Sequence, residues 1–436
     1  MLTTTRLKSE VTCMTSSETH NNKPTTAALI TLSFIPLIMV LGNSMIIPAL
    51  PVIEKALDIT SLQVSLLITL FSIPAGIVIP ITGILADRVG RKKVIFFSLL
   101  LYGIGGLLAG ISALVNGGSY PFLLASRILQ GIGAAGTSPI AMVLISDLYQ
   151  KEERSKALGI NEASNAFGKV LSPIFGSLLL LISWYAMFFV FPLLCLPIAI
   201  ALWKVIKEPV HKQKPLPLKQ YWLDIRKIFQ RKGKWLVTAF LAGSLALFTM
   251  FGVLFYLSDT LEKTYHIVGI KKGFILAIPL LALCLVAYWT GSHVKNQTSQ
   301  MKKFILLGLG VMAGFIVTMP WITQMVWLIA VAFGLGIGAG LILPCLNTLI
   351  TSAIGVQERG IITSLYGSVR FLGVAFGPPT FETLSNRPYL LFFGLSALFI
   401  LIAVAAAIFI HQPQRLRGKD GQYRLLIRKE RFQPSS

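Results

Sequence analysis

Long apolar stretches recur along the whole chain and are separated by short polar segments. Each stretch is about 20 residues long, which is enough for a helix to cross the hydrocarbon layer of a bilayer. The pattern predicts an all-α membrane protein with twelve transmembrane helices, arranged as two six-helix bundles. The predicted bounds are 27–50, 62–86, 94–115, 120–147, 157–181 and 184–206, then 235–258, 270–292, 303–322, 325–351, 360–383 and 388–411.

The polar segments divide the chain into five parts. Residues 1–26 are rich in Thr, Ser and Asn, and we expect them to form a disordered cytoplasmic tail. The two bundles, 27–206 and 235–411, are joined by a basic cytoplasmic linker at 207–234, and a basic cytoplasmic tail follows at 412–436. The N-terminal segment has no apolar core of the kind found in signal peptides, so we expect no cleaved signal.

Composition agrees with a membrane protein, and charge predicts its orientation. The chain is 54% hydrophobic and 13% charged, whereas soluble domains carry about 25% charged residues. The net charge is +22, but most lysines and arginines lie in loops and tails on one side of the predicted helices, which is the positive-inside pattern and not a nucleic-acid surface. We therefore expect a multi-pass plasma-membrane protein with both termini in the cytoplasm, in contact with anionic lipid. The exceptions are Lys55, Lys263, Lys271, Lys272 and Arg387 on the outer side, and Arg127, Lys169 and Arg370 inside helices.

An internal repeat relates the two predicted bundles. Five residues of the fourth and fifth helices recur at one ungapped offset of 205 positions in the tenth and eleventh. Such a match predicts parallel halves related by an axis along the membrane normal. The matched pairs are Pro139 with Pro344, Glu153 with Glu358, Arg154 with Arg359, Gly168 with Gly373, and Pro173 with Pro378.

The turn between the second and third predicted helices reads Gly83-Ile-Leu-Ala-Asp-Arg-Val-Gly-Arg-Lys-Lys93. This sequence resembles the signature loop of the major facilitator superfamily, the secondary transporters with two six-helix halves. The resemblance covers residues 27 to 411. It implies a gating loop made of Gly83, Asp87, Arg88, Gly90, Arg91 and Lys92, together with Asp147 at the end of the fourth helix.

In that family the loop acts as a cytoplasmic latch. The resemblance implies a charge network of Asp87, Arg91 and Asp147, with Asp87 docking at the N-terminal end of the eleventh helix near Gly360. An acid in this position interacts favourably with the helix dipole. The first helix contains Leu41-Gly-Asn-Ser-Met-Ile-Ile-Pro48, which is similar to the twelve-helix drug:proton antiporter (multidrug efflux) branch.

Three residues are candidates for proton coupling. Arg127 lies in Arg127-Ile-Leu-Gln-Gly131, which resembles the R-x-x-Q-G motif in which the arginine is implicated in proton transfer. Glu162 and Lys169 lie seven residues apart on one face of the fifth helix, and Glu162 is the single carboxylate that we place inside a membrane helix. Two simpler interpretations stay open, namely that Arg127 only holds backbone carbonyls and that Glu162 is a solvated helix-end residue.

Five further polar residues are candidates for lining the substrate cavity. They are Asn43, Gln130, Asn165, Asn347 and Arg370. By the repeat offset, Arg370 is equivalent to Asn165, so both should lie at similar depth in opposite halves. The predicted membrane interior thus holds three cations and one acid, which favours anionic, zwitterionic or neutral amphiphiles over lipophilic cations.

The fifth and eleventh helices each carry a glycine–proline motif. Gly168-Lys-Val-Leu-Ser-Pro173 resembles the antiporter motif G-x-x-x-G-P, although Ser172 stands in place of the second glycine and Ser177 in place of a later one. Gly373, Gly377 and Pro378 keep the pattern better. We expect both prolines to bend their helices.

The sequence therefore predicts a secondary active transporter, with no cofactor, that exports drugs or amphiphilic small molecules in exchange for protons and works as a monomer. A dedicated exporter of an anionic metabolite such as a siderophore is the alternative, followed by an importer or lipid flippase and then by a gated channel. No phosphate-binding loop, nucleophile motif or metal-ligand spacing supports an ATP-driven pump or an enzyme. We expect free thiols at Cys13, Cys195, Cys284 and Cys345.

Overall fold

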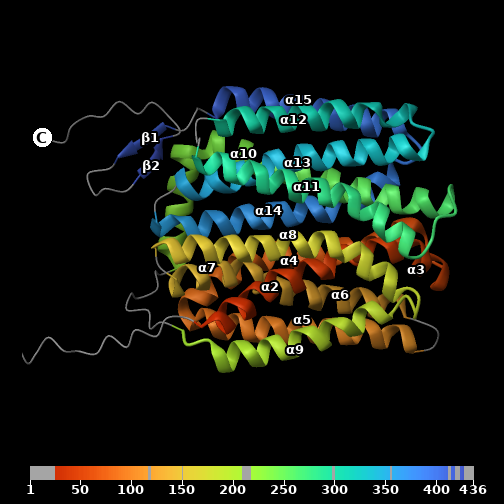
Figure 1. Cartoon of the computed structure of the whole chain (residues 1–436), viewed down its shortest axis with the longest axis horizontal. Helices are drawn as coiled ribbons and strands as arrows, with labels where there is room; N and C mark the ends of the chain where they lie inside the picture. Colours follow the sequence, from red (N-terminus) through yellow and green to blue (C-terminus); the bar gives the residue numbers. More distant parts are fainter. Residues whose placement is uncertain are drawn as a thin grey trace, which may run out of the picture.

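The structure, a computed structural model, describes residues 25–115, 119–149, 151–208, 218–296, 300–353, 356–410, 414–417 and 423–426. Long helices that run roughly parallel to one another make up most of it (Figure 1). Residues 1–24 of the predicted N-terminal tail (1–26), with Cys13 among them, lie outside the described residues.

The first half of the bundle consists of helices α2 to α9. Its elements are α2 (Thr26–Ser44), η1 (Ile47–Ala49), α3 (Leu50–Ala56), α4 (Ser61–Val89), α5 (Arg91–Leu114), α6 (Tyr120–Ala135), α7 (Ser138–Leu148), α8 (Lys151–Leu179) and α9 (Ala186–Val205). The second half contains α10 (Leu218–Lys263), α11 (Ile270–Asn296), α12 (Met301–Thr318), η3 (Met319–Trp321), α13 (Met325–Ala353), α14 (Val356–Thr383) and α15 (Pro388–Phe409).

Two of the predicted membrane helices are broken into shorter pieces at prolines. The first continues from α2 through η1 into α3, with Pro48 and Pro51 at the starts of the new pieces. The fourth breaks between α6 and α7, just before Pro139. Proline lacks the backbone N–H that would continue the hydrogen bonding of the preceding turn, so a new helical segment begins at each site.

Eleven helical stretches of the described chain are long and apolar enough to cross a membrane. The remaining predicted helix, the fifth at 157–181, corresponds to α8, which has a similar length but does not meet this criterion. The reason is its polar side chains, which include Glu162, Asn165 and Lys169. The prediction of an all-α membrane bundle is confirmed, and its most polar helix carries the candidate site.

The two halves lie side by side, and α8 and α14 run through the middle of the molecule (Figure 1). Helix α8 contacts α11 and helix α14 contacts α4, so each of these two contacts joins one half to the other. The helices α8 and α14 are also the pair that the sequence repeat relates. We call the end of the bundle near the β-hairpin the tail end, and the end near α3 the far end.

Two segments differ from the sequence predictions. The predicted linker at 207–234 is helical from Leu218 onward, where α10 begins. Apolar residues recur there at helical spacing between the charges, and Ile228 is buried, so the segment is an amphipathic extension of the membrane helix. In the predicted basic tail, β1 (Gln414–Arg417) and β2 (Tyr423–Leu426) pair antiparallel, so the chain is not entirely α.

Candidate functional site

Helix α8 has an apolar face and an opposite polar face. Ile160, Phe167 and Leu178 are exposed on one side, where they suit contact with lipid. At 100° per residue, Glu162 and Lys169 fall on the opposite side. The side chain of Glu162 is exposed there, although this face points away from the apolar outer surface.

Contacts on both sides of the polar face place it between the two halves. Gly168 packs on α2, since a Cβ at this position would lie 3.3 Å from the Leu37 backbone. On the other side, the Cys284 thiol of α11 donates a hydrogen bond to the Ala166 carbonyl at 3.1 Å. Glu162, Asn165 and Lys169 therefore face the region where the first half meets the second.

Arg370 on α14 contributes a second positive charge to this region. Its Nη1 donates to Asn347 Oδ1 on α13 at 3.4 Å, and its guanidinium lies 5.3 Å from the centre of the Tyr366 ring. The Lys169 ammonium interacts electrostatically with both Glu162 and Arg370. Within the described residues, Arg370 Nε is buried without a hydrogen-bond partner, and the exposed Glu162 carboxylate forms no hydrogen bond or ion pair.

Arg127 lies elsewhere and is fully buried inside the first half. Its Nε donates to the Leu67 carbonyl of α4 at 3.0 Å, and its Nη2 donates to the Gly42 carbonyl of α2 at 3.2 Å. Its Nη1 donates to Gln130 Oε1 at 2.5 Å. The guanidinium thus connects three helices, and its polar partners are carbonyl oxygens and not carboxylates.

The structure does not bring all the predicted cavity residues together. Asn165, Asn347 and Arg370 lie in the region between the halves. Asn43 is buried in the first half, where its side-chain amide donates to Ser72 Oγ at 3.4 Å, and Gln130 is fully buried beside Arg127. The sequence could not separate the two groups, because a polar residue in a membrane helix can face either a cavity or a neighbouring helix.

The predicted gating loop lies at the tail end and contains the predicted charge network. The Arg91 guanidinium pairs with Asp87, with Nη2 3.5 Å from Oδ1, and also with Asp147 on α7. Gly90 has a φ of 108°, a backbone conformation that favours glycine, and it connects α4 directly to α5. Arg88 is exposed, and the Nζ of Lys92 donates to the Trp203 carbonyl of α9 at 2.7 Å.

Glu208 is a member of this network that the sequence analysis missed. Its carboxylate accepts hydrogen bonds from the backbone N–H groups of Arg91 at 2.5 Å and Lys92 at 3.2 Å. It therefore caps the start of α5, where a negative charge is favourable. The available signal was an isolated acid in a basic linker, but its partners lie more than a hundred residues earlier in the chain.

The predicted docking of Asp87 onto the second half is not made in this conformation. Among the described residues, Asp87 pairs with Arg91 of its own half. A Cβ added at Gly360 would meet no atom within 4 Å, whereas one at Gly83 would lie 3.2 Å from Ser364 Oγ on α14. Among the described residues, Gly83 packs against the second half, whereas Asp87 does not pair with it.

We expect Asp87→Asn to reduce transport several-fold while expression and stability stay intact. Arg91 keeps Asp147 as a partner, so the fold loses only a partly exposed interaction. What is lost is the negative charge that would meet α14 when the tail end closes. Flux in vesicles, normalised to the amount of folded protein, measures the effect, and Asp58→Asn at the far end is the matched control. A flux equal to that of the wild type would exclude the latch role.

The glycine–proline motifs bring helices into close contact within each half. Gly373 packs against the Ser244 carbonyl of α10, as Gly168 packs against α2, and Gly377 packs against the Phe248 carbonyl. Ser172, which stands in place of a family glycine, is buried and donates to the Gly168 carbonyl at 2.6 Å. Pro173 and Pro378 both lie inside continuous helices, so neither ends its helix.

A membrane bundle with two related halves, charged side chains between them and ion pairs at one end has the features of a carrier that alternates between two openings. The chain matches the family model of the Major Facilitator Superfamily over residues 32–378. It belongs to this superfamily and is a membrane transporter. In the described residues, no group of histidine, cysteine and acidic side chains could hold a metal ion.

Several curated proteins and solved structures are similar to this chain. A protein named "Bacillibactin exporter" from Bacillus subtilis (strain 168) is 41% identical over 384 residues, covering 87% of this chain and 95% of the relative. "Multidrug resistance protein 1" of the same organism is 26% identical over 384 residues, covering 84% and 92%. The crystal structure of the human organic anion transporter TETRAN is 19% identical with a TM-score of 0.67, covering 87% of this chain and 99% of that one, which shows the shared fold.

Proposed function

We propose that this transporter exports an anionic metabolite of the siderophore class. The observation that carries the proposal is a pair of cations, Lys169 from the first half and Arg370 from the second, on the faces that meet between the halves. A ligand with several negative oxygens could bind both at once, and guanidinium groups suit such oxygens well. The 41% identity to a bacillibactin exporter supports the same substrate class.

Export of many unrelated drugs is the second candidate. It is favoured by the 26% identity to a multidrug resistance protein and by the exposed Glu162 carboxylate, which could attract a lipophilic cation. Lys169 interacts electrostatically with Glu162 and with Arg370, so the region holds two cations and one acid, and a cationic drug would meet net repulsion there. The charge balance therefore favours the anionic substrate.

We further propose that export is driven by protons that enter through Glu162. In the antiport cycle, the carrier would move outward with substrate bound to Lys169 and Arg370, and would return without substrate while Glu162 carries a proton. Release of the substrate on one side and of the proton on the other would then couple the two flows in opposite directions.

The proposed orientation places the tail end in the cytoplasm of the cell, at the plasma membrane. The basic gating loop lies at that end, and so does the amphipathic start of α10. Positive charge concentrates on the cytoplasmic side of membrane proteins and contacts anionic lipid there. The transporter would work as a monomer, because the path between the halves is formed by a single chain.

Liposomes with an imposed pH gradient and an internal pH dye test this function. We expect proton flux with bacillibactin and little with a lipophilic cation such as tetraphenylphosphonium. Replacing Lys169 and Arg370 together by glutamine should reduce bacillibactin-evoked flux at least tenfold, and Glu162→Gln should abolish proton movement. Lys271→Gln is the matched control, since Lys271 is exposed at the far end. Flux with the cation alone would favour the drug exporter, and transport without proton flux would remove the coupling role of Glu162.

A further inference from the structure

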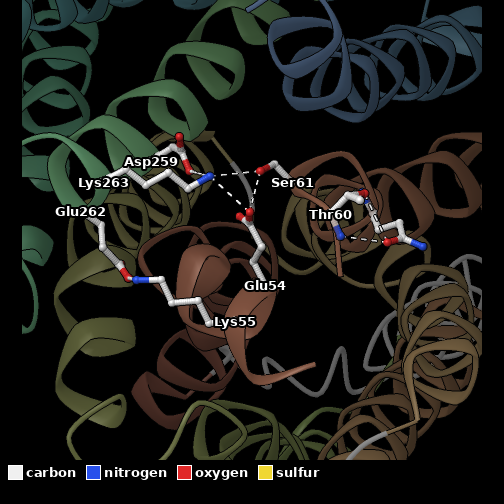
Figure 2. A network of polar contacts seen from close by, with 8 residues as sticks. Glu54, Lys55, Thr60, Ser61, Asp259, Glu262 and Lys263 are labelled. Atoms are coloured by element: carbon white, nitrogen blue, oxygen red, sulfur yellow. Dashed lines mark hydrogen bonds and ion pairs between the residues drawn. The ribbon is translucent and has the colours of Figure 1, made fainter. Parts of the chain in front are cut away.

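A network of charged side chains joins the two halves at the far end of the bundle (Figure 2). The Nζ of Lys55 on α3 lies 3.1 Å from Glu262 Oε1 on α10, and the Nζ of Lys263 on α10 lies 3.2 Å from Glu54 Oε1 on α3. Both pairs connect the first half to the second. None of these four residues belongs to the site described above.

The two pairs are reciprocal. The dipeptide Glu54-Lys55 recurs as Glu262-Lys263 in the corresponding helix of the second half, 208 residues later. Each glutamate binds the lysine of the opposite dipeptide, so the arrangement follows the approximate two-fold relation between the halves. One repeated dipeptide therefore supplies both sides of a self-complementary contact.

Three of the four charged groups also have a partner within their own half. Glu262 Oε2 lies 2.9 Å from the Nζ of the buried Lys272, and Lys263 Nζ lies 2.8 Å from Asp259 Oδ1. Ser61 Oγ donates to Glu54 Oε1 at 2.7 Å. Lys55 is the exception, and its side chain is 68% exposed, so water can solvate it.

This arrangement allows the halves to separate at low cost. If the far end opened, the nearly buried Glu262 would still neutralise Lys272, and Lys263 would still pair with Asp259. No buried charge would be left alone, which is the event that makes breaking an ion pair expensive. In each pair that is lost, the lysine side chain is exposed, so water can solvate its charge, and such pairs contribute little individually.

Hydrogen bonds to backbone carbonyls and one close glycine contact also close this end. The Ser258 hydroxyl of α10 donates to the Ile47 carbonyl of η1 at 2.8 Å, and the Thr69 hydroxyl of α4 donates to the Ala375 carbonyl of α14 at 2.7 Å. Gly273 of α11 packs against Pro173 and Ser177 of α8. The far end is therefore closed in this structure, and the ion pairs lie across its closed seam.

We propose that the reciprocal pairs Lys55–Glu262 and Glu54–Lys263 form the far-end gate of this transporter. They close the bundle on that side when the tail end is open. When the far end opens, the pairs break and water solvates the separated charges. Glu262 is the central residue, because it links the permanent partner Lys272 to the exchangeable partner Lys55. The proposal concerns the transport cycle and is independent of the substrate.

The test measures how often the far end opens. Ser258→Cys introduces a buried thiol at the seam, since Ser258 is 1% exposed. The purified full-length protein in lipid nanodiscs is treated with a hydrophilic maleimide, and wild-type protein, which keeps Ser258, reports any labelling of the native thiols. Lys55→Glu in the Ser258→Cys background places a like charge opposite Glu262. We expect it to accelerate labelling of the introduced thiol about three- to tenfold with an unchanged melting temperature.

Two variants separate the gate from general charge effects. Lys55→Arg keeps the pair with Glu262, so it should label at the rate of the Ser258→Cys parent. Lys271→Glu reverses an exposed charge at the same end and should leave the rate unchanged. Labelling of Lys55→Glu at the parental rate, or equal acceleration by Lys271→Glu, would overturn the proposal. The assay needs no substrate, so its failure is distinguishable from a wrong substrate assignment.

Discussion

Gly273→Val should abolish transport while the protein remains folded and membrane-inserted. A Cβ at Gly273 would lie 2.6 Å from Ser177 Oγ and 2.7 Å from the Pro173 carbonyl oxygen. Contacts this short cannot persist, so α11 and α8 must separate at the far end. Because these helices belong to different halves, the separation opens the seam without unpacking either half. A carrier that cannot close one end cannot complete its cycle.

Two measurements check this expectation. Substrate-driven flux in liposomes should fall at least tenfold, and in nanodiscs the thiol introduced by Ser258→Cys should label at least as fast as it does with Lys55→Glu. Gly291→Val is the matched control, since it adds the same side chain to α11 at a position where a Cβ would meet nothing within 4 Å. If Gly273→Val transported normally, the contact between α8 and α11 would not be part of the closed state that the cycle requires.

Periodicity and repetition in the sequence were sufficient to predict much of the fold. Apolar runs of membrane-crossing length correspond to eleven spans and to the more polar α8. The offset of 205 relates Lys151, at the start of α8, to Val356, at the start of α14, and these helices form equivalent contacts in the two halves. Helix length and the internal repeat are local or repeated properties of the sequence, so they can be predicted without knowing which helices are in contact.

The parts that were missed depend on contacts between distant residues. Glu54 and Lys263 are more than two hundred positions apart, and each alone is an ordinary charged residue near a helix end. The amphipathic start of α10 resembles a linker in the sequence, because its charges lower the average hydropathy and hide the helical spacing of its apolar residues. Pairing partners and buried faces are properties of the packed molecule, and one sequence does not contain them explicitly.

The candidate site shows the same limit. A polar stripe on α8 was visible in the spacing of Glu162, Asn165 and Lys169, because residues three and four apart share a helical face. The depth of each side chain in the membrane and the residues that it contacts could not be predicted from this spacing. Arg127 and Lys169 are both cations inside predicted membrane helices, yet one is sealed among carbonyl groups of its own half and the other faces the opposite half.

That contrast leads to a second prediction with a large effect, Arg127→Met. We expect a loss of roughly 2–4 kcal/mol in the free energy of unfolding, because hydrogen bonds to a charged group contribute about 1.5–3 kcal/mol each and the desolvated acceptors stay behind. The carbonyls of Leu67 and Gly42 and the amide of Gln130 remain buried without the guanidinium. Methionine fills most of the volume but donates no hydrogen bond.

Stability and coupling must be measured separately to interpret this variant. Thermal unfolding in nanodiscs reports the fold, and proton flux per folded molecule reports the coupling. Arg127→Lys is the informative comparison: it keeps the charge, but an ammonium cannot reproduce the planar fork that reaches α2, α4 and Gln130. If Arg127 holds helices together, both variants lose stability and the surviving molecules remain coupled. If it carries protons, Arg127→Met keeps the stability of the wild type, while substrate crosses without proton flux. The partners seen around Arg127 are carbonyl oxygens, which favour the first outcome.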